Sequence, residues 1–251
     1  MKIQDADYKI VSNKEISGGY FELKIKAPSI CRFCKPGQFF MLSVPYVFLR
    51  RPISIHNIEG DIISFLYKVV GKGTEILSKI KTGEIQALGA LGNGYDLNTD
   101  SVSPAIIAGG TGIASLYFLA KKLKRKGILY YGAKSKKDFI CVDKFHKLGW
   151  DIFTATEDGS SGYKGFVTDL YMQKTNLHSK DESFAYVCGP LPMLKSFINI
   201  AKTKNIKAYA SLEQKMACAI GNCQACAVNI NGINKMVCKD GPVFDIKEIN
   251  L

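Results

Sequence analysis

The chain has 251 residues, of which 47% are hydrophobic and 22% charged, a composition typical of a folded globular protein with one large or two ordinary domains. Its formal net charge is +12, but no aromatic-basic motif accompanies the scattered lysines, which argues against a nucleic-acid partner. No apolar run reaches transmembrane length, and no signal peptide is evident. We therefore expect a cytoplasmic protein without a membrane span, in a reducing compartment where clustered cysteines bind metal or do redox chemistry.

The first 98 residues contain short, alternating apolar segments bounded by turn signals, the pattern of antiparallel strands. One short helix is predicted in 74–83. Strands are predicted in 20–28, 37–45, 51–70 and 84–95, the third being a hairpin that turns at Glu59, Gly60 and Asp61. Many short strands with a single helix predict an antiparallel β-barrel.

The pattern changes from Ser103 onward, where apolar runs alternate with amphipathic segments. Strands are predicted in 104–110, 128–134, 150–160 and 183–190, and helices in 113–127, 137–149, 165–175 and 191–205. This alternation predicts a parallel, doubly wound α/β sheet. We therefore expect an α+β multidomain fold with an antiparallel barrel domain at 1–98, an α/β parallel-sheet domain at 99–209 and a small cysteine-rich module at 210–251.

Four of the chain's 8 cysteines are clustered with the spacing Cys-x4-Cys-x2-Cys-x11-Cys, at Cys218, Cys223, Cys226 and Cys238. Plant-type two-iron ferredoxins begin with the same spacing and have a distant fourth ligand. Small residues between these thiols let a loop wrap closely around a cluster. A four-cysteine zinc site usually has two Cys-x2-Cys pairs, and here only Cys223 and Cys226 form one. The spacing favours an iron–sulfur cluster over zinc, and over buried or free thiols.

Cys31 and Cys34 form a second Cys-x2-Cys, the spacing of a redox motif. A Lys35-Pro36-Gly37 turn follows them instead of a helix, and no partner pair for zinc is evident in the sequence. We interpret both as structural thiols at a turn of the barrel.

Three short stretches suit phosphate groups. Gly109–Gly112 lies between a predicted strand and helix, where glycines let the backbone approach a pyrophosphate, although an ordinary tight turn has the same pattern. Cys188–Pro190 ends another strand, at the edge where such sheets bind ligands, and equally suits a plain strand-to-helix junction. Arg50–Ile55 offers an arginine fork beside a proline, which is also compatible with a surface arginine on a strand.

These stretches occur in the order RPIS, GKGT, AGGTGIA and CGP, followed by SLEQKMACAIGNCQAC and VCKDGPVF. In this order the chain resembles the ferredoxin–NADP reductase superfamily of flavoproteins. Within it, the chain is similar to the electron-transfer subunits of NAD-dependent (class 1B) dihydroorotate dehydrogenases, from about Tyr8 to Phe244. The resemblance implies FAD in the barrel domain, NAD as the substrate of the α/β domain, and a [2Fe-2S] cluster in the module.

The resemblance also implies cofactor contacts for particular residues. The FAD residues are Arg51, Pro52, Ile53, Ser54, Leu66, Tyr67, Lys68, Gly73 and Thr74. The NAD residues are Gly109, Gly110, Thr111, Gly112, Cys188, Gly189 and Pro190, and the metal ligands are Cys218, Cys223, Cys226 and Cys238. The tyrosine that often covers the flavin in this superfamily is replaced by Ile53. Lys134 and Lys136 favour a 2′-phosphate on the dinucleotide, whereas the resemblance implies NAD.

We expect no catalytic side chain, because the histidines show no acid–base pattern and the chemistry belongs to the cofactors. The resemblance implies an oxidoreductase subunit of pyrimidine biosynthesis. It would pass electrons from NADH via FAD and a [2Fe-2S] cluster to the FMN-containing catalytic subunit of dihydroorotate dehydrogenase, in a heterotetramer with two copies of each subunit. The alternatives are a small subunit of another flavin and iron–sulfur complex, such as an NADH-dependent ferredoxin–NADP reductase or a sulfide dehydrogenase, and a non-enzymatic zinc-binding interaction module.

Overall fold

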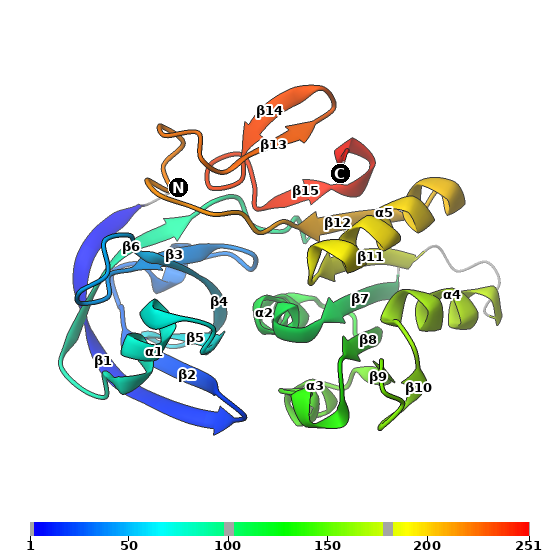
Figure 1. Ribbon diagram of the computed structural model, residues 1–251, viewed down its shortest axis with the longest axis horizontal. Coiled ribbons are helices and arrows are strands. Elements are labelled where there is room, and N and C mark those ends of the chain that lie inside the picture. The colour runs from blue at the N-terminus through cyan, green and yellow to red at the C-terminus, as the bar shows by residue number, and fades with distance from the viewer. Residues whose placement is uncertain (1–2, 98–102, 178–182, 251) are drawn as a thin grey trace. The chain divides into compact units, whose positions relative to one another are not determined.

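The computed structural model describes residues 3–97, 103–177 and 183–250 (Figure 1). The chain forms two compact units. The first, which we call the barrel unit, comprises Met1–Gly94, Glu213–Val228 and Asn234–Pro242. The second, the sheet unit, comprises Tyr95–Leu212, Asn229–Ile233 and Val243–Leu251. The predicted boundary at 98/99 lies outside the described residues. Within the described residues, no helix has the length and apolarity needed to cross a membrane.

The barrel unit is built on a closed barrel with the strand order β1-β2-β5-β4-β3-β6. Its strands are β1 (Gln4–Ser17), β2 (Tyr20–Lys26), β3 (Phe39–Leu42), β4 (Arg51–Glu59), β5 (Ile62–Lys68) and β6 (Glu84–Leu91). All neighbouring strands are antiparallel, which confirms the predicted barrel. Phe40 and Phe65 fill its interior, fully buried and edge to face with ring centroids 5.4 Å apart.

Short helical segments interrupt the barrel strands. Helix α1 (Lys72–Lys79) follows β5, and the 3-10 turn η1 (Cys31–Phe33) precedes β3. The predicted hairpin is confirmed, because Glu59 pairs with Ile62 across the β4–β5 turn. Gly60 sits in that turn with a φ of 56°, a left-handed conformation that favours glycine.

The sheet unit contains a seven-stranded sheet with the order β10-β9-β8-β7-β11-β12-β15. The strands are β7 (Ser103–Gly109), β8 (Ile128–Ala133), β9 (Asp151–Thr156), β10 (Tyr163–Lys164), β11 (Ser183–Cys188), β12 (Lys207–Ser211) and β15 (Val243–Asp245). All neighbouring strands from β10 through β9, β8, β7 and β11 to β12 are parallel, as predicted. Strand β15 pairs antiparallel with β12 at the edge of the sheet. The strand order reverses at β7. The chain continues from β7 to β8 on one side, and later returns to form β11 on the other side of β7.

Helices cover both faces of this sheet. They are α2 (Ile113–Lys122), α3 (Val142–Lys147), α4 (Val167–Leu177) and α5 (Leu191–Lys204), with 3-10 turns η2 (Gly110–Gly112), η3 (Lys136–Asp138) and η4 (Ile246–Glu248). Right-handed crossovers place α2 and α3 on one face and α4 and α5 on the other, as Figure 1 shows. A two-stranded sheet, β13 (Ala227–Ile230) with β14 (Ile233–Met236), precedes β15.

The prediction of one helix over 137–149 is wrong in its first part. Residues Lys136–Asp138 form the 3-10 turn η3, and helix α3 begins only at Val142. Cys141, expected as an ordinary helical position, precedes that helix with a left-handed φ of 62°. A left-handed residue cannot continue a right-handed helix, so the helix starts after it.

Candidate cofactor sites

Two stretches of the predicted flavin site meet in the barrel unit. Arg51 begins β4, where it pairs with Leu42 of β3, and Gly73 lies in the first turn of α1. The Arg51 side chain covers the Gly73 backbone so closely that a β-carbon built on Gly73 would lie 3.0 Å from Cδ and 3.1 Å from Cζ of Arg51. The structure thus places a guanidinium at the N-terminal turn of a helix, and both groups attract a phosphate.

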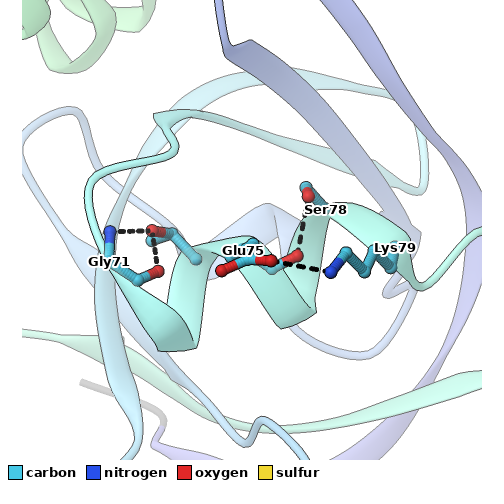
Figure 2. Close-up of polar contacts among 5 residues, drawn as sticks. Gly71, Glu75, Ser78 and Lys79 are labelled. Atoms are coloured by element: carbon cyan, nitrogen blue, oxygen red, sulfur yellow. Dashed lines mark hydrogen bonds and ion pairs between the residues drawn. The ribbon is translucent and has the colours of Figure 1, made fainter.

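The N-terminal turn of α1 is closed by its own side chains (Figure 2). The Thr74 hydroxyl accepts hydrogen bonds from the amides of Val70 and Gly71, at 2.9 and 3.3 Å, and donates to the Gly71 carbonyl at 3.0 Å. Glu75 points along the helix to Lys79, with 2.7 Å between Oε1 and Nζ. Because the only acid of the first turn is paired with Lys79, its negative charge is offset beside the helix N-terminus, whose dipole favours an anion.

The other predicted flavin residues line β4 and β5. Ile53 and Ser54 are half-buried on β4, whereas Pro52 is exposed. Leu66 is buried on β5, and the Lys68 ammonium lies 4.8 Å from the centroid of the Tyr20 ring. The structure therefore brings the RPIS stretch, β5 and the start of α1 into one barrel.

Tyr67 is tied to the barrel itself. Its hydroxyl donates to Asn13 Oδ1 at 3.1 Å, and Asn13 Nδ2 donates in turn to the Leu77 and Ile80 carbonyls at the end of α1. Burial raises the pKa of Tyr67 to about 12, so the hydroxyl stays protonated. Asn13 thus anchors the end of α1. The sequence did not predict this role, because a single polar residue in a barrel domain is not part of any recognisable motif.

The predicted dinucleotide residues meet in the sheet unit, where strand order reverses. Gly112 packs against the backbone of Cys188, and a β-carbon on Gly112 would lie 2.8 Å from the Gly189 nitrogen. A β-carbon on Gly109 would lie 2.8 Å from Pro190 Cδ, so these glycines allow the ends of β7 and β11 to approach closely. Sheets of this kind bind ligands at such a reversal, beyond the carboxyl ends of the strands.

Polar groups hold this junction in place. The Ser115 hydroxyl donates to the Gly112 carbonyl at 3.0 Å and lies 3.3 Å from Cys188 Sγ. The Tyr131 hydroxyl donates to the Gly110 carbonyl at 3.1 Å. Thr111 and Pro190 are exposed beside these buried groups. Ser115 was not predicted, although its place three residues beyond Gly112 marks it as part of the same helical turn.

Beyond the neighbouring strand ends, the surface of the sheet unit has an open depression of about 640 Å³. It is lined by residues that follow β8 and β9, namely Lys134, Ser135, Lys136, Lys137, Asp138, Asp158 and Ser160. The sequence-predicted pair Lys134 and Lys136 is thus part of a larger polar wall.

The four clustered cysteines form two pairs in the barrel unit. The Cys223 amide donates to Cys218 Sγ at 3.3 Å, and the Cys238 amide donates to Cys226 Sγ at 3.5 Å. Cys226 and Cys238 are buried, whereas Cys223 is exposed. Left-handed backbone at Ala219, Gly221 and Gln224 curls the loop, so that amides face the sulfurs.

The pKa values of two of these thiols are shifted in opposite directions. Burial raises the pKa of Cys218, but hydrogen bonds led by the Cys223 amide outweigh it and lower the value to about 6. Burial, reinforced by the Cys226 side chain, raises the pKa of Cys238 to about 12. Within the described residues no three His, Cys, Asp or Glu side chains are grouped to hold one metal ion. Two cysteine pairs fit a two-iron cluster better than one tetrahedral zinc, which needs its ligands around one centre.

Cys31 and Cys34 lie at the turn before β3. The Cys34 thiol donates to the Ile30 carbonyl at 3.4 Å. Burial raises the pKa of Cys31 to about 11 and that of Cys34 to about 12. Reactive cysteines have lowered pKa values, so these thiols have the character of structural ones.

Comparisons with known proteins agree with this geometry. The model of the iron–sulfur cluster binding domain of dihydroorotate dehydrogenase B matches residues 213–250, and that of an oxidoreductase NAD-binding domain matches residues 106–198. A Clostridium acetobutylicum relative is 42% identical over 94% of this chain and 93% of its own. A Bacillus pumilus relative is 39% identical over 96% of both chains. Each of these two relatives is named the electron transfer subunit of dihydroorotate dehydrogenase B (NAD(+)).

Solved structures show the same architecture. The NADH-dependent reduced ferredoxin-NADP oxidoreductase superimposes with a TM-score of 0.87 at 29% identity, covering 97% of this chain and 89% of that chain. A ferredoxin NADP+ reductase from Neisseria gonorrhoeae, solved with bound FAD and NADP, shares the fold at a TM-score of 0.68 and 18% identity, over 79% of this chain and 91% of that chain.

Barrel, doubly wound sheet and cysteine loop together define an oxidoreductase component of the ferredoxin reductase type. The curated relatives narrow this class, because their similarity extends over nearly the whole chain. The chain belongs to the family of electron transfer subunits of dihydroorotate dehydrogenase B.

Proposed function

We propose that the subunit carries electrons between a nicotinamide dinucleotide at the sheet unit and a catalytic partner, through FAD in the barrel unit and a [2Fe-2S] cluster at the cysteine loop. One observation supports the placement of FAD next to the cluster along this route. The contact between Arg51 and Gly73 and all four clustered cysteines belong to the same compact unit, so the proposed flavin and cluster sites share one scaffold. The glycine turn lies in the other unit.

Each cofactor has a proposed set of residues in this chain. Arg51 and the amides at the start of α1 take the FAD pyrophosphate, while Ile53, Ser54 and β5 line the ring. Cys218 with Cys223 holds one iron, and Cys226 with Cys238 holds the other. Gly109–Gly112 and Cys188–Pro190 hold the dinucleotide. We also propose domain boundaries near 98/99 and 209/210.

The bound cofactors supply hydride exchange with the nicotinamide and one-electron transfer toward the partner. The chain's own residues bind and orient these groups, and no side chain is assigned a proton-transfer role. The electrons balance in both directions. Oxidation of dihydroorotate to orotate releases two electrons, which end on NAD+, and NADH supplies two electrons when the reaction runs in reverse.

As an electron transfer subunit, the chain acts with a catalytic subunit. We propose that this partner carries FMN and that two copies of each subunit assemble. We further propose that the partner docks on the loop between β3 and β4, where Tyr46 is 94% and Phe48 99% exposed directly before the flavin stretch. Aromatic side chains so exposed are typical of interaction surfaces.

Purification of the native complex tests this function. We expect the co-purified partner to be a dihydroorotate dehydrogenase. We also expect the complex to oxidise one NADH for each orotate that it reduces. A second candidate function is supported by the likeness to the NADH-dependent reduced ferredoxin-NADP oxidoreductase, which covers 97% of this chain. A different flavin and iron–sulfur partner, with no orotate-dependent NADH oxidation, would favour that candidate. A colourless protein with zinc would overturn both.

A further inference from the structure

Asn13 is a buried asparagine on strand β1, placed there by an irregularity of the strand. Tyr8 and Ile10 are buried at alternate positions, and strict alternation would bury Ser12 next. The pairing of β1 with β2 instead shifts its register between Ile10 and Ser12, and Asn13, which is 2% exposed, takes the buried position. A bulge of this kind redirects a side chain. It therefore places an amide group in the interior, beside helix α1.

Both polar atoms of the Asn13 side chain are bonded within the chain. Nδ2 donates to the carbonyls of Leu77 and Ile80, at 2.7 and 2.9 Å. Oδ1 accepts from the Tyr67 hydroxyl at 3.1 Å. Because an amide nitrogen has two protons and both are used, Asn13 has no donor left for a ligand. Any effect of Asn13 on a cofactor must therefore pass through α1.

Lys81 supports the same end of α1. Its ammonium donates to the Ser78 carbonyl at 2.7 Å and to the Asn13 carbonyl at 3.1 Å. The last carbonyls of a helix have no partner within the helix, and the two side chains supply donors to them. A cation at this end also complements the helix dipole. Strand β1 and the residue after the helix thus hold the carboxyl end of α1 together.

Helix α1 has only 8 residues, too few to be stable by itself. Its orientation therefore depends on its contacts with the rest of the barrel unit. Leu77 is fully buried, and the bonds from Asn13 fix the carboxyl end. The other end is the turn at Gly73, which the Arg51 guanidinium covers. Because a short helix is rigid, the anchor at its carboxyl end determines where the amides of its first turn point.

We propose that Asn13 is a positioning residue for FAD. By holding the carboxyl end of α1, it directs the amides of the first turn toward the pyrophosphate. The inference rests on the proposed FAD site and adds a residue that acts on the cofactor through the helix. Without the two donors α1 adopts other orientations, and the affinity for FAD falls in proportion to the fraction of molecules that keep the competent one. Two hydrogen bonds of ordinary strength correspond to a loss of about tenfold.

The test compares FAD with riboflavin, which has the same ring but no phosphate, by fluorescence titration of the cluster-loaded protein freed of flavin. Asn13→Asp keeps the size of the side chain and the acceptor for Tyr67, but it places an oxygen against the two carbonyls. We expect it to bind FAD about tenfold more weakly and riboflavin with unchanged affinity. The cluster's visible absorption should be retained, which shows that the variant is folded.

Asn57→Asp is the matched control. Asn57 is a buried asparagine of β4 whose amide donates to Glu59 Oε1 at 2.8 Å. Its substitution should leave the affinities for both flavins unaltered. Lys81 gives a second measurement that does not depend on a buried substitution. Lys81→Met removes the donor to Ser78 and should weaken FAD binding about threefold, whereas Lys81→Arg keeps a cation and its donors and should restore it.

Three results would overturn the inference. They are a parallel loss of FAD and riboflavin affinity in Asn13→Asp, the same FAD loss in Asn57→Asp, and unchanged FAD affinity in both Asn13→Asp and Lys81→Met. Arg51→Ala separates this inference from the proposed function. FAD affinity that falls in Arg51→Ala but not in Asn13→Asp would contradict the positioning role alone, whereas unchanged affinity in Arg51→Ala would contradict the proposed FAD site itself.

Discussion

Arg51 and Gly73 are 22 positions apart in sequence, yet the guanidinium of one covers the backbone of the other. The contact depends on both residues. Arg51 lies at the start of β4, where it pairs with Leu42, and Gly73 leaves room for its guanidinium because it has no side chain. Thr74 and Glu75 bond within α1, so the charge facing the anion comes from Arg51 and the helix amides.

Arg51→Ala should weaken FAD binding by about tenfold to a hundredfold, because a hydrogen bond to a charged group contributes about 1.5–3 kcal/mol. Arg50→Ala is the matched control, since Arg50 forms a bidentate pair with Asp5, with both N–O distances 3.0 Å. The measurement is the flavin-to-protein ratio after dialysis, followed by FAD titration. Full flavin retention in Arg51→Ala would show that the guanidinium binds something else.

Gly73→Ala should displace Arg51 and lower FAD occupancy, because the added methyl group would overlap the guanidinium and its Nε. Gly71→Ala tests the specificity of this effect. A β-carbon on Gly71 meets nothing within 4 Å, and its φ of 178° is open to any residue. The flavin content of both variants decides the matter. Equal flavin loss in the two would point to a general effect on α1.

Gly112→Ala should raise the KM for NADH about tenfold while the flavin and cluster spectra stay unchanged. The new β-carbon would overlap the Cys188 carbonyl and approach the Gly189 nitrogen to 2.8 Å, and overpacking against backbone costs about 1–3 kcal/mol. Steady-state dye reduction at varied NADH gives the KM. An unchanged KM would indicate that the dinucleotide binds away from the glycine turn.

Much of this architecture follows from local patterns. Alternation predicted the barrel, and alternating strand and helix segments predicted the parallel sheet, because both depend on neighbouring residues. The pairing of β15 with β12 joins Val243–Asp245 to residues more than thirty positions earlier, and no local pattern encodes such a choice. The same holds for the contact of Arg51 with Gly73. Strand β1 was missed because its sequence is largely polar and exposed.

Cys31 and Cys34 should resist alkylation in the folded protein at pH 8. Burial raises their pKa values to about 11 and 12, so about one thiol in a thousand or fewer is ionised at that pH. Labelling should accelerate only as the pH approaches 11, or when the chain is unfolded. Iodoacetamide treatment followed by peptide mass spectrometry measures each thiol separately. Rapid labelling of the folded protein at pH 8 would instead indicate a redox pair.

Phe48→Ser should weaken association with the catalytic subunit about tenfold, because truncation of an interface anchor typically costs more than 1 kcal/mol. NADH-dependent dye reduction should not change. Phe166→Ser is the control, since Phe166 is a 61% exposed aromatic residue of the sheet unit. Surface plasmon resonance with the partner measures the affinity. Equal effects of both substitutions on the affinity would show that the β3–β4 loop is not part of the interface.

The most direct test of the account separates electron entry from electron exit. Cys223→Ser removes one proposed iron ligand, whereas Cys31→Ser leaves the cysteine loop intact. In the complex with the catalytic subunit, we would measure NADH-driven dye reduction and NADH-driven reduction of orotate. We expect Cys223→Ser to keep dye reduction and to lose orotate reduction together with the cluster's visible absorption, while Cys31→Ser keeps all three. Orotate reduction that survives without the cluster, or equal loss of both activities in Cys223→Ser, would contradict it.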